Sequence, residues 1–234
     1  MEAIQFQENR MLDRKKRYLQ IALNSTPSEG EEIIHQLPSS DRILIEAGTP
    51  LIKAYGIEGI QRLKRAWKLQ IAGDFPDVYI VADTKCMDRG KTEVEIAKAG
   101  GASAATVLGA APIETINYFI LACEELGLDS MVDMIGVEQP IKILRKLKKM
   151  PTVVVLHRGV DEEVFDKNKP IPFIQINKVR SSFNTLISIA GGDSIREVQR
   201  AIFNDADIVV VWKNFYSPDS NTGILAEEFL KEIK

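Results

Sequence analysis

Two carboxylates and an amine lie close together in the stretch VADTKCMDRG, residues 81–90. Side chains two positions apart lie on the same face of a strand, so Asp83 and Lys85 are expected to address one pocket. Asp88 follows three residues later, where the strand is expected to have ended. A lysine flanked by carboxylates stays protonated, because the opposite charges favour its cationic form. The motif therefore suits proton delivery or oxyanion stabilisation better than Schiff-base chemistry, which needs a neutral amine.

Two further carboxylates lie within apolar sequence that is typical of strands. Glu46 occurs in ILIEAG and Asp133 in MVDMIG. A buried carboxylate is costly unless a partner such as a metal or a lysine compensates its charge. Glu46 and Asp83, predicted at the ends of neighbouring strands, could share a Mg²⁺ whose other ligands are water and substrate oxygens. The alternative is a cluster of buried salt bridges with a structural role only.

His157 is one of only two histidines, and it follows the apolar run VVVL, residues 153–156. Its position at a predicted strand end makes it a candidate for proton transfer, because an imidazole titrates near neutral pH. The alternative is a hydrogen-bonded core histidine. His35 lies in a polar helical segment and is expected at the surface.

The elements that must position these residues alternate regularly along the chain. Apolar runs of strand length alternate with segments of helical period, a pattern typical of repeated βα units around a parallel sheet. Helices are expected between the strands, among them 113–126 and 194–203, the second opened by Ser194 and Glu197 at capping-box spacing. Eight strands are predicted, at residues 18–23, 43–47, 78–82, 104–108, 130–134, 152–156, 186–190 and 208–211.

Eight βα units without an interrupting linker predict an α/β fold, and specifically a single (β/α)8 TIM barrel over residues 17–234. An open doubly wound sheet usually has five or six strands and a glycine-rich first turn, and the first turn here, LNST, has no glycine. Residues 1–16 are polar and charged and are expected to form an N-terminal arm or an extra helix.

The active site of such a barrel lies at the carboxyl ends of its strands, so the polar residues at those ends form the candidate site. The turn Gly191-Gly192 follows the seventh strand and opens a helix, where backbone N–H groups can bind an anion. Barrels often hold a phosphate between the loops after strands seven and eight, which strengthens an otherwise weak glycine signal. The polar positions at the strand ends are Asn24, Glu46, Asp83, Lys85, Asp88, Thr106, Asp133, His157, Arg158, Gly191, Gly192, Trp212 and Lys213.

Composition excludes several classes of protein. With 45% hydrophobic and 27% charged residues and a formal net charge of -3, the 234-residue chain is expected to be globular. Its basic residues are dispersed, which argues against a nucleic-acid partner. No apolar stretch approaches the roughly 20 residues that cross a membrane, and the N-terminus lacks the pattern of a signal peptide. With only two cysteines, the protein is expected to be cytoplasmic.

The motifs, in this order, resemble the orotidine monophosphate decarboxylase superfamily, and within it the branch of 3-hexulose-6-phosphate synthase and 3-keto-L-gulonate-6-phosphate decarboxylase. The combination of EAGTPLIK with ADTKCMD is specific to that branch, and the contexts of Asp133 and His157 are most similar to the archaeal synthases. The segments that carry the resemblance are LQIAL (19–23), IEAGTPLIKAYG (45–56), VADTKCMDRG (81–90), TVLG (106–109), MVDMIGV (131–137), LHRGVDEE (156–163), ISIAGG (187–192) and ADIVVV (206–211).

The resemblance implies a carbon–carbon lyase or synthase that joins formaldehyde to ribulose 5-phosphate through a metal-bound enediolate. It implies a homodimer of barrels with active sites near the subunit interface, a sugar phosphate as substrate and Mg²⁺ as cofactor. The site residues that it implies are Glu46 and Asp83 on the metal, Lys85 as the central cation, Asp88 offered to the partner's site, His157 and Asp133 in catalysis, Gly191, Gly192 and Lys213 on the phosphate, and Asn24 on the substrate.

The chain departs from this family pattern at two strand ends. Asn24 stands where the family has Asp, which removes a carboxylate from the pocket. Trp212 and Lys213 stand where the family has Gly followed by Arg or a small residue, so a large ring occupies space where backbone would approach a phosphate. Two alternatives therefore stay open: a decarboxylase or synthase of the superfamily acting on a different small substrate, and a binding or regulatory homologue without turnover.

Overall fold

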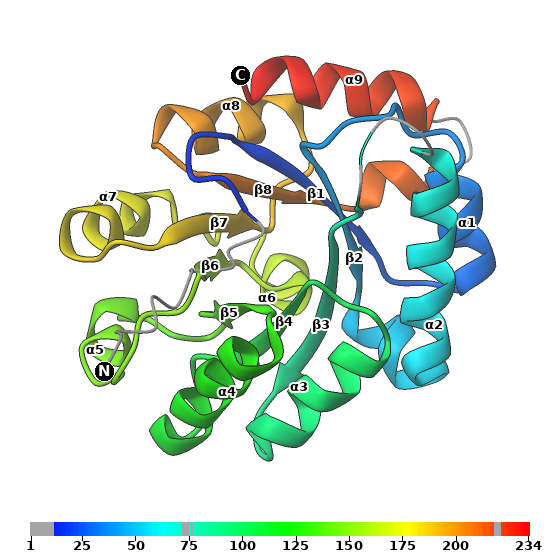
Figure 1. Ribbon diagram of the computed structural model, residues 1–234. Coiled ribbons are helices and arrows are strands. Elements are labelled where there is room, and N and C mark those ends of the chain that lie inside the picture. The colour runs from blue at the N-terminus through cyan, green and yellow to red at the C-terminus, as the bar shows by residue number, and fades with distance from the viewer. Residues whose placement is uncertain (1–11, 72–74, 76, 218–220) are drawn as a thin grey trace.

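The computed structural model describes residues 12–71, 75, 77–217 and 221–234, and these fold into one closed barrel (Figure 1). Within this described part, eight parallel strands pair in chain order, and the last pairs with the first. The strands are β1 (Tyr18–Leu23), β2 (Ile43–Ala47), β3 (Ile80–Cys86), β4 (Ala104–Leu108), β5 (Asp129–Asp133), β6 (Val153–His157), β7 (Leu186–Ala190) and β8 (Ile208–Val211). The predicted (β/α)8 barrel is confirmed.

Helices surround the barrel in Figure 1 and follow the strands in alternation. The capping box expected from the sequence is present, with Ser194 Oγ accepting the N–H of Glu197 at the start of α8. The helices in the described residues are α1 (Pro27–Ile34), α2 (Thr49–Gln70), α3 (Gly90–Ala99), α4 (Ile113–Leu126), α5 (Pro140–Leu144), α6 (Val160–Phe165), α7 (Phe173–Ser182), α8 (Ile195–Phe203) and α9 (Thr222–Glu232), with a 3-10 helix η1 (Lys213–Tyr216) after β8.

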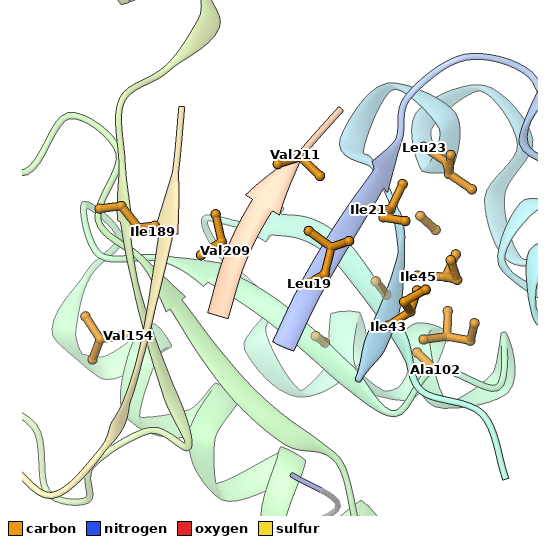
Figure 2. Close-up of a cluster of buried hydrophobic side chains, with 14 of the residues drawn as sticks. Leu19, Ile21, Leu23, Ile43, Ile45, Ala102, Val154, Ile189, Val209 and Val211 are labelled. Carbon is orange, nitrogen blue, oxygen red and sulfur yellow. The ribbon is translucent and has the colours of Figure 1, made fainter. Parts of the chain in front are cut away.

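The two faces of the strands form two different cores. Alternate residues point outward and pack against the helices, as Figure 2 shows for Leu19, Ile21 and Leu23 of β1. The residues between them point into the barrel, and those nearest the strands' amino ends form a second apolar cluster that includes Leu44, Val81 and Met131. Because strand side chains repeat every two residues, the next inward positions come one layer closer to the carboxyl ends. That layer is largely polar: Gln20, Glu46, Asp83, Thr106, Asp133 and Ser188 belong to it, all of them buried.

The strand prediction was wrong mainly at β3. The expected strand, 78–82, ends before Asp83, whereas the observed strand runs from Ile80 to Cys86 and includes both Asp83 and Lys85. Polar residues at its carboxyl end hid this extension, because a buried strand is expected to be apolar.

The N-terminal arm is only partly described, since residues 1–11 lie outside the described residues. The remainder, residues 12–16, contains no helix. Leu12 is buried in the inner apolar cluster, and the N–H of Asp13 donates to the Tyr18 hydroxyl at 2.8 Å. This end of the arm therefore packs against the amino end of the barrel, away from the polar layer. Among the described residues, no helix combines the length and apolarity needed to cross a bilayer.

Candidate active site

The carboxyl ends of the strands surround a cavity of about 700 Å³. Most of the residues predicted for the site line it, and six of the strands, β1 to β6, contribute polar or charged side chains to its wall. The predicted residues in its wall are Asn24, Glu46, Asp83, Lys85, Thr106, Asp133, His157, Arg158, Gly191 and Trp212. Asp88, Gly192 and Lys213 lie outside this wall.

Lys85 connects two carboxylates from strands that are not neighbours. Its Nζ lies 2.8 Å from Asp83 Oδ2 on β3 and 3.0 Å from Asp133 Oδ2 on β5. Burial alone would lower the pKa of Lys85, but the charges of Asp83 and Asp133 raise it above its ordinary value. The amine therefore stays protonated at neutral pH, as the sequence predicts.

The backbone at Lys85 is held in an unusual conformation. Its φ of +45° is left-handed, and the register between β3 and β4 shifts between Ala82 and Cys86. Such a bulge re-aims the side chains of a strand. The N–H of Lys85 donates to Thr106 Oγ1 at 2.9 Å, which holds the bulge in place. A left-handed non-glycine residue costs on the order of 1 kcal/mol, and strain of this kind is concentrated at functional sites.

Asp83 is fixed by three donors. Its Oδ1 accepts from the Thr106 hydroxyl at 2.7 Å, and its Oδ2 accepts from the Thr49 hydroxyl at 2.7 Å and from Lys85. Thr49 is the first residue of α2, so the second βα turn contributes directly to the site. With only 5% of its surface exposed, Asp83 has its charge compensated inside the barrel.

Asp133 pairs with His157 as well as with Lys85. His157 Nδ1 lies 2.9 Å from Oδ2 and 3.1 Å from Oδ1 of Asp133. Burial alone would raise the pKa of Asp133, but the positive charges of His157 and Lys85 lower it well below its ordinary value. Burial alone would also lower the pKa of His157, but Asp133 raises it above 6.5. Since Nδ1 is held by Asp133, Nε2 is the nitrogen left to exchange a proton with a substrate.

Glu46 is buried beside this network, and its carboxylate accepts from Gln20 Nε2. Burial, followed by the negative charge of Asp83, raises the pKa of Glu46 to about 7. The group can therefore gain or lose a proton near neutral pH. A cation placed beside Glu46 and Asp83 would instead favour its ionised form.

The donors around Glu46 fit a hard cation that retains other ligands. Gln20 Oε1 is buried without a hydrogen-bond partner, so an amide oxygen is available next to the Glu46 carboxylate. Carboxylate and amide oxygens suit Mg²⁺, which commonly uses one or two carboxylates and completes its octahedron with water and substrate. In the described part of the chain, no three His, Cys, Asp or Glu side chains are grouped as a metal site of their own. The residues thus fit a Mg²⁺ that shares its coordination with a substrate.

Asp88 does not join the network of its own chain. It is exposed in the loop between β3 and α3, where its carbonyl accepts from Cys86 Sγ at 3.1 Å. The assignment of Asp88 to a partner's site therefore stays a prediction.

The Gly191-Gly192 turn has a backbone that requires glycine at Gly191, and the two N–H groups that follow the turn are occupied. Gly191 has φ +107°, and a Cβ there would lie 2.5 Å from the Arg158 carbonyl oxygen. The N–H groups of Asp193 and Ser194, at the start of α8, both donate to Glu197 Oε2 at 3.0 Å. These two N–H groups are therefore not free to bind an anion, whereas the assignment of Gly191 and Gly192 to a phosphate stays a prediction.

The end of β8 is also engaged internally. The N–H groups of Trp212 and Lys213 donate to Asp193 Oδ1 at 2.6 and 3.1 Å. Lys213 Nζ pairs with the Glu163 carboxylate. Asn24, in the cavity wall, donates its N–H to the Tyr216 hydroxyl at 2.7 Å, which ties η1 to the end of β1.

Sequence reasoning missed Gln20 and Thr49, which lie in the cavity wall, and Asp193, which lies outside it and accepts the N–H of Trp212. The sequence does contain a pattern that could have identified Gln20. It is a polar residue within the apolar run YLQIAL, and a strand that continued to Asn24 would place both side chains on the same face. Thr49 and Asp193 follow strand ends without any pattern that separates them from ordinary helix-starting residues.

Comparisons with known proteins agree with this geometry. The model of the orotidine 5'-phosphate decarboxylase / HUMPS family matches residues 17–214. The bifunctional enzyme Fae/Hps of Methanocaldococcus jannaschii is 39% identical over 195 residues, which are 83% of this chain and 46% of that protein. That of Methanocella arvoryzae is 36% identical over 222 residues, 93% of this chain and 53% of that protein.

A solved structure supports the same relationship. The 3-hexulose-6-phosphate synthase of Salmonella typhimurium superposes with a TM-score of 0.80 at 26% identity, covering 92% of this chain and 98% of the synthase. The chain spans about half the length of the curated relatives it matches. From the extent of the family match and the order of the barrel, the chain belongs to the orotidine 5'-phosphate decarboxylase / HUMPS family.

Proposed function

We propose that the chain catalyses aldol-type carbon–carbon bond formation or cleavage of the hexulose-phosphate synthase kind. In the forward direction, a keto sugar loses a carbon-bound proton and the resulting enediolate adds to formaldehyde. The observation that carries the proposal is the network in one cavity, with Lys85 between Asp83 and Asp133 and with His157 on Asp133. The names of the relatives, Fae/Hps and 3-hexulose-6-phosphate synthase, support the same chemistry.

The residues of the network suit separate parts of this reaction. The Lys85 ammonium is positioned to stabilise negative charge that develops on the enediolate oxygens, since it is partly buried and already oriented by Asp83 and Asp133. His157 is held at Nδ1 by Asp133, so its Nε2 suits removal of the carbon-bound proton and delivery of a proton to the oxygen of formaldehyde. One proton leaves carbon and one reaches oxygen, so the reaction is balanced in protons.

Mg²⁺ is the cofactor we propose, held by Glu46 and Asp83 with the Gln20 amide oxygen nearby. When bound, it would act as a Lewis acid on two adjacent oxygens of the keto sugar. Asp83 also fixes Lys85, so the carboxylate has a positioning role that does not depend on the metal.

A homodimer with shared sites is the assembly we propose. The exposed position of Asp88, outside the cavity of its own chain, leaves its carboxylate available to a second copy. The cytoplasm is the proposed location.

Ribulose 5-phosphate is the keto sugar that the family resemblance implies, and the relatives' names are consistent with a sugar phosphate. A second candidate is the same chemistry on a keto sugar without phosphate, which the internal pairing of the N–H groups after β7 and β8 favours.

The test is an assay of formaldehyde with ribulose 5-phosphate and, separately, with ribulose, each with and without Mg²⁺. Wild-type protein is compared with Asp83→Ala and with Glu95→Ala, a control at an exposed position of α3. We expect Mg²⁺-dependent turnover of at least one keto sugar, abolished by Asp83→Ala and unaffected by Glu95→Ala. No turnover of either keto sugar would refute the proposed reaction, and turnover unaffected by Asp83→Ala would refute the site.

A further inference from the structure

The chain's own carboxylates occupy four backbone donors that follow β7 and β8. Asp193 Oδ1 accepts the N–H groups of Trp212 and Lys213, and Glu197 Oε2 accepts those of Asp193 and Ser194. These four N–H groups lie after the seventh and eighth strands, where barrels commonly hold a phosphate on backbone donors and a helix N-terminus. A carboxylate oxygen that accepts two successive N–H groups makes the contacts that a phosphate oxygen would otherwise make.

The side-chain cations at this end are also compensated. Lys213 Nζ pairs with Glu163, and an Arg158 guanidinium nitrogen lies 3.6 Å from the same carboxylate. Arg158 further donates to the Gly191 and Lys169 carbonyls, and only 10% of its side chain is exposed. Two positive charges, Arg158 and Lys213, are therefore matched by two negative charges, Glu163 and Asp193. A phosphate dianion would enter without net positive charge to balance it, and would meet two carboxylates.

The ring of Trp212 lies at the end of β8, where the family pattern has a glycine and therefore no side chain. Trp212 is in the cavity wall, and its ring lies edge-on to Tyr216, with centroids 6.4 Å apart. Tyr216 is anchored in turn by the N–H of Asn24, so the Trp212 ring has a supported position. An indole ring offers an apolar surface to the C–H groups of a sugar, and neighbouring polar groups can hydrogen-bond hydroxyls.

We propose that the end of the keto sugar that lies at β7–β8 is an uncharged, hydroxyl-bearing group, so that the enzyme selects an unphosphorylated keto sugar. The inference rests on the proposed carbon–carbon chemistry and names its substrate class. Asp193 is the specificity-determining residue, because its carboxylate occupies the two N–H groups of β8 and repels an anion.

One test compares kcat/KM for ribulose and ribulose 5-phosphate in the formaldehyde assay. We expect ribulose to be preferred by at least about tenfold, because a phosphate at this end would be desolvated beside the Asp193 and Glu163 carboxylates. An equal or higher kcat/KM for ribulose 5-phosphate would overturn the substrate class and leave the proposed reaction intact. No turnover of either would refute the proposed reaction, and the substrate class would then be decided by a binding measurement.

That measurement is the melting temperature with inorganic phosphate, compared with chloride at equal ionic strength. Wild-type protein is expected to show no specific shift. Asp193→Ala, which frees two backbone donors and removes a negative charge, is expected to be stabilised by millimolar phosphate. Asp193→Asn keeps an acceptor oxygen and is expected to gain less, and Glu95→Ala is the surface control. Stabilisation of the wild-type protein equal to that of Asp193→Ala, or no gain in either Asp193 variant, would overturn the proposal.

Discussion

The variant Glu46→Gln tests whether the buried carboxylate of Glu46, when ionised, destabilises the folded protein. Burial and the Asp83 charge raise the pKa of Glu46 from 4.5 to about 7. The folded state therefore disfavours ionised Glu46, and its ionisation lowers stability as the pH rises from 4.5 to about 7. The difference amounts to about 3 kcal/mol, since each pKa unit corresponds to roughly 1.4 kcal/mol. Glutamine has the same shape without the charge and can still accept from Gln20.

The measurement is urea unfolding as a function of pH. At about pH 8, Glu46→Gln is expected to be more stable than wild type by about 3 kcal/mol, and near pH 4.5 the two should be alike. Glu58→Gln, at an exposed position of α2, is the matched control and should show no such pH dependence. If Glu46→Gln lowers stability equally at both pH values, the carboxylate has a favourable partner and the burial argument fails.

The same variant tests the cofactor. Mg²⁺ bound at Glu46 would compensate its charge, so Mg²⁺ should recover much of the lost stability of wild type at about pH 8 and add little to Glu46→Gln. Equal stabilisation of both proteins by Mg²⁺ would place the ion elsewhere.

Three further perturbations address the remaining parts of the site. In an NMR titration, the pKa of His157 should lie above 6.5 in wild type and fall in Asp133→Asn, because burial remains while the opposite charge is lost; an unchanged pKa would contradict the pairing. Gly191→Ala forces a Cβ against a backbone carbonyl at positive φ, and should lower the free energy of unfolding by about 1–3 kcal/mol in urea. Mixing inactive Asp88→Ala with inactive Asp83→Ala should restore part of the activity if Asp88 completes a partner's site, whereas a mixture that stays inactive would refute a shared site.

Much of the barrel could be predicted because its strands are buried on both faces. Five strands, among them β4 and β7, have the predicted bounds, since each is a short apolar run between polar segments. Because both faces of the strands are apolar near their amino ends, the sequence did not show which residues point into the barrel and which point outward to the helices. β3 was placed too early, since its bulge and the left-handed Lys85 depend on hydrogen bonds to β4 that no local pattern encodes.

The members of the site were easier to predict than their partners. Glu46 and Asp133 stood out because carboxylates in apolar strands are costly without compensation. The contact between Lys85 and Asp133 could not be predicted, because it passes over β4 and depends on the curvature of the closed barrel. The occupation of backbone donors by Asp193 depends equally on the tertiary structure, since it joins the turn after β7 to the end of β8.

Exchange of the carbon-bound proton of the keto sugar with solvent is the step that the Lys85 network must catalyse, and it needs no formaldehyde. NMR in D₂O can follow this exchange for ribulose and ribulose 5-phosphate with wild type, Lys85→Met and the control Glu58→Gln, after circular dichroism has shown that each is folded. We expect Mg²⁺-dependent exchange in wild type and in the control, slowed by at least about a hundredfold in Lys85→Met. No exchange in wild type, or equal exchange in Lys85→Met, would contradict the central role of the network.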